Sequence, residues 1–317
     1  MVDSKQIERT KAIQRRTGRT FHVATRFLPE RARHPTYVLY AFFRVADEVV
    51  DDAGDTPPDE QAAQLESYRR QALGEEDPDG PVLEAFRDIA TEYDISESEI
   101  NDFIDAMKTD IHKSRYETYG ELEAYMRGSA AAVGVMMTEI MDLDQPEVAL
   151  PHAIALGEAF QLTNFLRDVR EDVIDRDRIY LPIETLEKYG ASIEDVENLE
   201  FTPEIGRAIQ AEMARTEELY HEGVAGIKYL PEDCQFPVLL SAVLYADHHR
   251  LIRKLEFDTI SHEPDLSMPR KLWLAARTRW HWQWNRDPEA VFQRVSTITE
   301  TDTPHHDPDR PDTTPAQ

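Results

Sequence analysis

The sequence predicts an all-α protein with a single domain. Apolar residues recur mostly at helical spacing along the 317 residues, alternating runs of β-branched residues are nearly absent, and glycine is scarce, with 12 residues. Hydrophobic residues make up 41% of the chain, enough for one large core. No repeat and no linker divides the sequence. We therefore expect one helical domain over residues 1–298.

The first half of this domain is predicted to contain five helices. Three of them cover residues 4–27, a segment that begins after Pro35, and residues 60–74. Ser96 and Glu99 have the spacing of a capping box for a helix that ends near Ile111. The fifth covers residues 121–143 and contains GSAAAVG (Gly128–Gly134), whose small residues would let another helix or a ligand approach closely.

The second half is predicted to continue in the same way, with helices over residues 151–175, 236–258 and 268–285. Another begins at Pro203 with Thr202 as its N-cap. The last helix carries all four tryptophans, which we expect to pack against the body rather than on a membrane. Residues 299–317 are mostly Thr, Asp and Pro, which predicts a disordered tail.

The charge balance is strongly acidic, with 62 Asp and Glu against 35 Lys and Arg, a formal net charge of −27. Such a surface repels nucleic acid and anionic lipid, so we expect both to be poor partners at low salt, and we expect no nucleic-acid partner. The acidity is also typical of salt adaptation, in which most acidic residues serve solubility rather than chemistry. Cys234 is the single cysteine, and no apolar stretch could span a bilayer. We expect a cytoplasmic protein, peripheral to the inner face of the membrane at most.

Two acidic pairs at helical spacing stand out within apolar segments. Asp47 and Asp51 lie four residues apart, and so do Asp168 and Asp172, so each pair shares one helix face. Each pair continues a polar stripe, and the other faces of both helices are apolar, as in buried helices. The stripes consist of Tyr37, Tyr40, Arg44, Asp47 and Asp51, and of Gln161, Asn164, Asp168 and Asp172.

These stripes predict a cavity that binds Mg²⁺ and a diphosphate. Hard cations take oxygen ligands and are often shared between carboxylates and phosphates. Arg44 and Arg167 lie beside the acidic pairs, and the planar guanidinium suits phosphate oxygens. The alternative is a pair of structural ion-pair networks.

Three segments resemble the squalene/phytoene synthase family: YAFFRVADEVVDD (Tyr40–Asp52), NFLRDVRED (Asn164–Asp172) and RDRIYLP (Arg176–Pro182). The resemblance extends from about Thr17 to Arg277. It implies a class I isoprenoid (terpenoid) synthase fold, a helical bundle with two acidic helices facing each other across a central cavity. The IYLP sequence is more similar to phytoene synthases than to squalene synthases.

The resemblance also implies roles for individual residues. The four aspartates would bind Mg²⁺, or Mn²⁺ in its place, and Asp47, Asp51, Asp168, Asp172, Tyr245 and Arg44 would form the catalytic set. Glu48 and Glu171 would assist the metal ligands. The residues expected to bind substrate or diphosphate are Arg19, Thr20, Tyr40, Arg44, Tyr125, Gln161, Asn164 and Arg167.

The implied reaction joins two molecules of geranylgeranyl diphosphate head to head. A cyclopropyl (prephytoene) diphosphate forms first and then rearranges to phytoene, the first step of carotenoid synthesis. Released diphosphate or a tyrosine hydroxyl would take the final proton. A water-excluding pocket would protect the allylic cation, with wall candidates Phe42, Phe43, Val133, Met136 and Met137.

Two alternatives remain open. A squalene or dehydrosqualene synthase would use the C15 substrate, farnesyl diphosphate. No glycine-rich nucleotide fingerprint is visible, so NADPH is not expected, which favours phytoene over squalene. A non-catalytic assembly factor is disfavoured because both acidic motifs are intact. In each enzymatic case the substrate is a prenyl diphosphate, and a hydrocarbon product implies transient membrane contact.

Overall fold

The computed structural model describes residues 23–298, in which helices and loops alternate without a β-strand. Arg19, Thr20, most of the predicted first helix and the predicted tail 299–317 lie outside the described residues. The long helices are α3 (Glu30–Asp51), α4 (Pro58–Ala72), α5 (Pro81–Glu92), α6 (Glu97–Thr109), α9 (Pro146–Arg167), α13 (Pro203–Ala225), α14 (Glu232–Lys254) and α15 (Met268–Trp284). The shorter elements are α7 (Tyr119–Met126), η1 (Arg127–Ala131), α8 (Ala132–Glu139), α10 (Val169–Arg176), α11 (Ile183–Lys188), α12 (Ile193–Glu197), η2 (Ile227–Tyr229) and α16 (Pro288–Val295).

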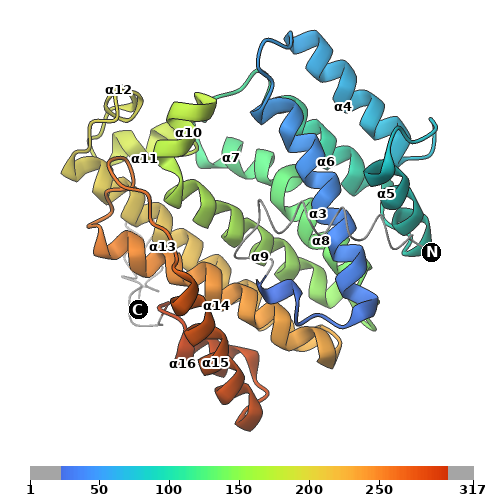
Figure 1. Cartoon of the computed structure of the whole chain (residues 1–317). Coiled ribbons are helices and arrows are strands. Elements are labelled where there is room, and N and C mark those ends of the chain that lie inside the picture. The colour runs from blue at the N-terminus through green and yellow to red at the C-terminus, as the bar shows by residue number, and fades with distance from the viewer. Residues whose placement is uncertain (1–22, 299–317) are drawn as a thin grey trace, which may run out of the picture.

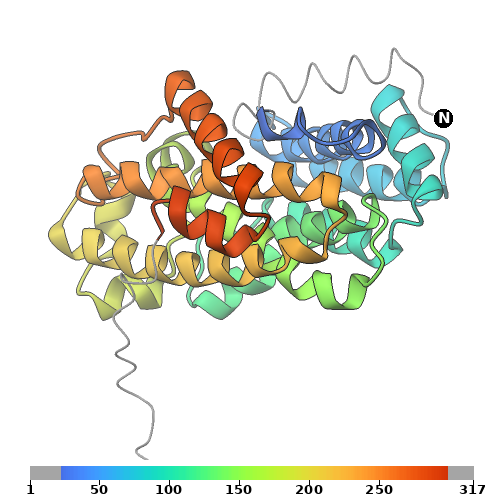
Figure 2. The same ribbon diagram turned by 90° about the horizontal axis from the view of Figure 1, so that it is seen from below.

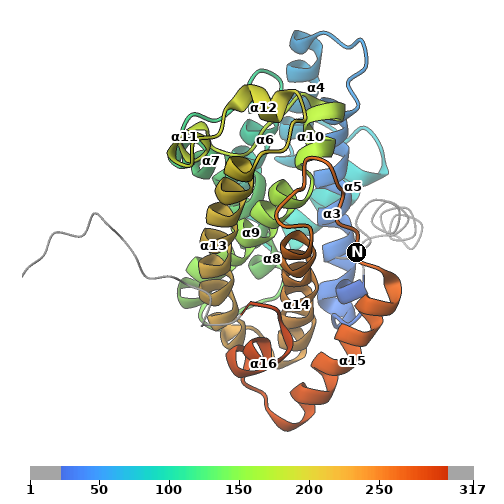
Figure 3. The same ribbon diagram turned by 90° about the vertical axis from the view of Figure 1, so that its left-hand side faces the viewer.

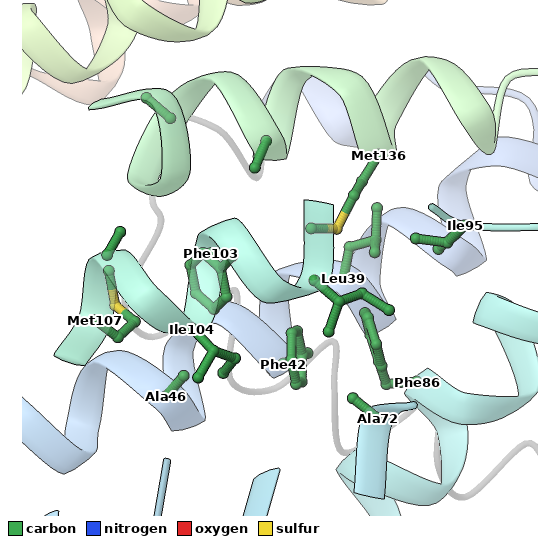
Figure 4. Close-up of a cluster of buried hydrophobic side chains, with 14 of the residues drawn as sticks. Leu39, Phe42, Ala46, Ala72, Phe86, Ile95, Phe103, Ile104, Met107 and Met136 are labelled. Atoms are coloured by element: carbon green, nitrogen blue, oxygen red, sulfur yellow. The ribbon is translucent and has the colours of Figure 1, made fainter. Parts of the chain in front are cut away.

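Helix α9 crosses the middle of the molecule (Figure 1) and packs against α8, α13 and α14. On one side of it, α3 and α6 bury a core in which the rings of Phe42 and Phe86 stack with centroids 3.8 Å apart. Figure 4 shows this cluster, with Phe103 and Met136 beside the two rings. On the other side, α13, α14, α15 and α16 form a second core, and these C-terminal helices lie on the near face in Figure 2. The all-α prediction is therefore confirmed.

Glycines allow α8 and α9 to approach each other closely. A Cβ atom on Gly134 would lie 2.6 Å from the carbonyl oxygen of Ala153, and one on Gly157 would lie 2.7 Å from that of Ala130. Both distances are shorter than real Cβ contacts. The small-residue run thus lets a second helix approach, as its composition predicted.

Several predicted boundaries are wrong for identifiable reasons. The predicted helix over residues 121–143 is divided by the π-helical turn η1 and ends at Glu139. The capping box is absent, because the Ser96 hydroxyl donates to Glu139 from α8 at 2.7 Å. Glu99 instead accepts two hydrogen bonds from Arg127. By contrast, Thr202 caps α13 as predicted, by accepting from the Ile205 amide at 3.3 Å.

The expected packing of the tryptophans is correct for Trp282 alone. Its indole ring is buried between α15 and the body, whereas Trp273, Trp280 and Trp284 are exposed. Sequence composition could not separate these cases, because the packed face of α15 is determined by how it lies on α14 and α16.

Candidate active site

Helix α3 carries the first acidic pair on a partly buried face. Phe42 and Ala46 are fully buried on its packed side, whereas Asp47 and Asp51 are only partly buried. Arg44 lies within reach of two acidic residues on the same helix, 3.3 Å from the Glu48 carboxylate and 3.8 Å from that of Asp51. The predicted polar stripe therefore exists, although Tyr37 at its start is almost fully buried.

The second acidic pair spans a break between two helices, which corrects the prediction of one continuous helix. Helix α9 ends at Arg167, Asp168 leaves helical geometry with φ −103° and ψ 19°, and α10 begins at Val169. Backbone hydrogen bonds of 2.8 Å nevertheless run from the Asp168 amide to Asn164 and from the Asp172 amide to Asp168. The backbone hydrogen bonds therefore continue across the break, although Asp168 itself lies outside helical geometry.

Two arginines, Arg176 at the end of α10 and Arg178 just after it, lie against the acidic segments. Arg176 lies 3.4 Å from the Asp51 carboxylate and 2.9 Å from that of Asp172. Arg178 donates to Asp51 at 2.9 Å and to the Asp110 carbonyl at 3.2 Å. The Arg176 guanidinium thus bridges a carboxylate of α3 and one of α10, whereas Arg178 joins α3 to Asp110. The chain turns between the arginines at Asp177, whose φ of 51° is left-handed.

Carboxyl groups in this region are held at unusual pKa values. Burial, reinforced by the nearby Asp51, raises the pKa of Asp47 to about 7. Burial likewise raises the pKa of Asp172 to about 8, although Arg176 opposes the shift. Removing carboxylates from water disfavours their charged form unless a cation compensates them. Clusters of such groups in a cleft are typical of functional sites.

The carboxylates suit a divalent cation in their chemistry. Among residues 23–298, no three His, Cys, Asp or Glu side chains are already gathered to hold a metal. Asp51 and Asp172 are paired with arginines, whereas Asp47 makes no ion pair with a described residue. A partly buried carboxylate that makes no ion pair is costly when ionised, and Mg²⁺ takes such oxygen ligands. The donor set therefore fits a metal of this kind.

Cationic and phenolic groups lie beside the second acidic pair. The Arg167 guanidinium donates to the Asp168 carboxylate at 2.6 Å. Burial raises the pKa of Tyr245, on α14, to about 12, and the charges of Arg167, Tyr40 and Asp168 also act on it. Those interactions indicate that α3, α9 and α14 bring these predicted residues together. Gln161 and Asn164 lie partly buried on the same stretch of α9.

A cluster of stacked rings adjoins the carboxylates. Tyr125 from α7 and Phe165 from α9 both face Tyr180, with ring centroids 5.9 Å and 3.8 Å away. The Tyr125 hydroxyl donates at 2.8 Å to Asp110, whose pKa burial raises to about 7. The other carboxylate oxygen of Asp110 is buried without a hydrogen bond.

Sequence reasoning assigned Tyr125 but missed Asp110, Arg176, Arg178 and Tyr180. Three of these residues lie within RDRIYLP, a segment that was identified as a motif without roles for its residues. Asp110 follows a helix of ordinary composition, so no pattern in the sequence distinguished it.

An apolar cavity of about 120 Å³, partly open to solvent, lies between α8, α9 and α14. Val133 and Met137 line it, as predicted, together with Leu156, Phe160 and Val238. Phe160 stacks on Tyr245 with centroids 4.6 Å apart, which links the cavity to the polar groups. Phe42 and Met136 belong to the buried core instead, and Phe43 packs against Phe103.

An all-helical fold, carboxylates bridged by an arginine and an apolar cavity are the features of an all-α prenyltransferase of the terpenoid synthase type. The sequence pattern of the squalene/phytoene synthase family matches residues 14–273. The chain belongs to this family.

Several relatives have curated functions. The phytoene synthase of Rhodobacter capsulatus is 31% identical over 281 residues, covering 88% of this chain and 82% of that protein. The 15-cis-phytoene synthase of Synechocystis sp. is 30% identical over 283 residues, covering 82% of each chain. A solved dehydrosqualene synthase in complex with ligand superposes with a TM-score of 0.79 at 25% identity, covering 89% of this chain and 98% of that one.

Proposed function

We propose that the protein is a phytoene synthase. It condenses two molecules of geranylgeranyl diphosphate through the cyclopropyl intermediate and releases diphosphate. The observation that carries this proposal is the bridging of the Asp51 and Asp172 carboxylates by Arg176, in a helical fold that also contains an apolar cavity. Phytoene synthases at about 30% identity over most of the chain support the C20 substrate.

The site would assist departure of the diphosphate. Asp47, Asp51, Asp168 and Asp172 would hold Mg²⁺, which neutralises charge on the leaving group. Arg44 and Arg167 would bind diphosphate oxygens in the same region, because guanidinium groups donate in pairs to phosphate. Binding that strengthens as charge develops lowers the barrier to ionisation. Arg19 and Thr20 are proposed as further phosphate contacts.

The ring cluster would protect the allylic cation. Tyr125, Phe165 and Tyr180 exclude water and present aromatic faces, which attract cations. The pKa of Tyr245 is raised to about 12, so its hydroxyl stays protonated at neutral pH. Tyr245 is therefore suited to donate a hydrogen bond, and the released diphosphate is the better acceptor for the final proton.

One alternative rests on a specific observation. The structural similarity to a dehydrosqualene synthase favours a C30 product from farnesyl diphosphate. The purified protein should be incubated with each prenyl diphosphate and Mg²⁺, with and without NADPH. We expect a C40 hydrocarbon from the C20 substrate without NADPH and loss of turnover with a chelator. A C30 product made at the higher kcat/KM would replace the phytoene assignment.

The hydrocarbon product also implies transient contact with a membrane. No helix among residues 23–298 is long and apolar enough to cross a bilayer. Any such contact would therefore involve a surface of the described domain or a segment outside it.

A further inference from the structure

Helix α15 presents an exposed apolar ridge on the outside of the molecule. Residues at every fourth position face solvent along it: Met268, Leu272, Ala276, Trp280 and Trp284. Trp280 is 62% exposed and Trp284 is 78% exposed, and Trp273 beside them is 46% exposed. The opposite face of the helix buries Leu274, Thr278 and Trp282. Figure 3 shows α15 along an outer edge of the molecule, beyond α14.

The charge on this segment is opposite to that of the chain. No Asp or Glu occurs between Leu266 and Arg286, although the whole chain carries 62 acidic residues. The five cations in the segment are Arg270, Lys271, Arg277, Arg279 and Arg286. Lys271 is buried and Arg270 is paired with Asp247, so the positive charge on the surface of this segment comes from Arg277, Arg279 and Arg286.

Three of these arginines lie against aromatic rings instead of carboxylates. Arg277 lies 5.1 Å from the ring centroid of Trp273, whereas Arg279 and Arg286 lie 5.4 Å from those of Phe236 and Trp282. Within residues 23–298, none of the three forms an ion pair. Arg277 also donates a hydrogen bond of 2.7 Å to the Arg294 carbonyl. No carboxylate among the described residues neutralises the three charges, so they can attract an anionic partner.

The combination of exposed indoles and unpaired arginines fits a bilayer surface. Indole rings prefer the boundary between headgroups and acyl chains, and arginines reach the phosphates. A symmetric contact with a second copy would bring the cations of two α15 helices together. A contact between α15 and an acidic face of a second copy would join two different surfaces. Such a heterologous contact would tend to add further copies without closing.

We propose that the α15 ridge, defined as Met268, Leu272, Trp273, Trp280 and Trp284, docks on the surface of an anionic phospholipid bilayer. Trp280 and Trp284 enter the interface, and Arg277, Arg279 and Arg286 contact headgroup phosphates. The docking helix is joined to the helix that carries Tyr245, because Arg270 at the start of α15 donates at 2.6 Å to Asp247 on α14, two residues after Tyr245. The proposal does not depend on the proposed reaction, since lipid binding requires no turnover.

The test uses the full chain and vesicles of phosphatidylcholine with or without phosphatidylglycerol. We expect the protein to sediment with the anionic vesicles, and W280S/W284S to lower its partition coefficient by about tenfold or more. R279Q/R286Q should weaken binding to anionic vesicles. It should also reduce the protein's preference for anionic over neutral vesicles. V148S is the matched control, because Val148 is an exposed apolar residue at the start of α9, and it should bind as the unmodified protein does.

Membrane docking can also be measured on the unmodified protein, whose folding no substitution affects. Brominated phospholipids should quench tryptophan emission of the unmodified protein, because the exposed indoles reach the acyl chains. Absence of quenching, or equal sedimentation of W280S/W284S, overturns the proposal. Sedimentation velocity identifies the other occupant: a vesicle-independent oligomer that W280S/W284S dissociates would assign the ridge to a second copy of the chain.

Discussion

Arg178 donates a hydrogen bond of 2.9 Å to Asp51, a residue 127 positions earlier in the chain. The side chain of Arg178 is almost fully buried, and it reaches Asp51 because the chain turns sharply after α10. Together with Arg176, it fixes the separation of the two acidic segments. The arginines are therefore positioning residues in the proposed site, and their removal tests the arrangement directly.

Arg178→Gln should lower both activity and stability. It leaves the carboxylate of Asp51 without its closest cation and removes a donor to the Asp110 carbonyl. Breaking one partner of a buried pair costs about 3 kcal/mol, and misplacement of the acidic segments should cost about 100-fold in kcat. Steady-state assays and thermal unfolding measure the two effects. Arg207→Gln, at an exposed pair with Glu204, is the control and should change neither appreciably.

Asp47→Asn and Asp168→Asn should each abolish most turnover without unfolding the protein. Each replaces a proposed metal ligand by an amide of the same shape, and we expect a loss of at least about 100-fold in kcat. A second readout is the rise in melting temperature on addition of Mg²⁺, which should be smaller in both variants. Asp59→Asn at the exposed start of α4 is the control. Normal activity in either site variant would remove that residue from the metal site.

Glu158→Gln should stabilise the protein at alkaline pH. Burial, with Glu123 and Glu222 nearby, raises the pKa of Glu158 to about 7 from an ordinary value of 4.5. The folded state therefore favours the protonated form, so ionisation lowers stability as the pH rises from 4.5 to 7, and the cost stays constant above 7. Allowing for solvent screening, the variant should gain about 1 kcal/mol at pH 8.5 and nothing at pH 4.

Urea unfolding of the Glu158→Gln protein at both pH values measures this difference. Glu75→Gln, at an exposed position, should give the same change at each pH. A gain at pH 4 equal to that at pH 8.5 would show that ionisation of Glu158 is not its cause.

Gly134→Ala should destabilise the junction of α8 and α9. Its Cβ would lie 2.6 Å from the Ala153 carbonyl oxygen, so one helix must shift, at a cost of about 1–3 kcal/mol. Because Gly134 also lines the apolar cavity, KM for the prenyl diphosphate should rise. Gly120→Ala is the matched control: its nearest neighbour is 3.8 Å away, and alanine favours a helix, so stability should not fall. Equal unfolding free energies for the two variants would contradict the close packing.

The all-α class and the apolar faces of α3 and α9 could be predicted from the amino-acid sequence. These properties follow from residue spacing, because helical periodicity decides which side chains share a face. The Thr202 cap was readable for the same reason, since its partner, the Ile205 amide, lies three residues away.

Contacts between side chains far apart in the chain could be identified only from the tertiary structure. The pairing of Arg176 and Arg178 with Asp51, the burial of Asp110 and the exposure of Trp280 and Trp284 depend on how helices pack. Ser96 shows the competition directly, because its hydroxyl bonds to Glu139 from α8 instead of capping its own helix. Contacts between residues far apart in the chain are selected by packing and desolvation over the whole fold, and local spacing carries no record of them.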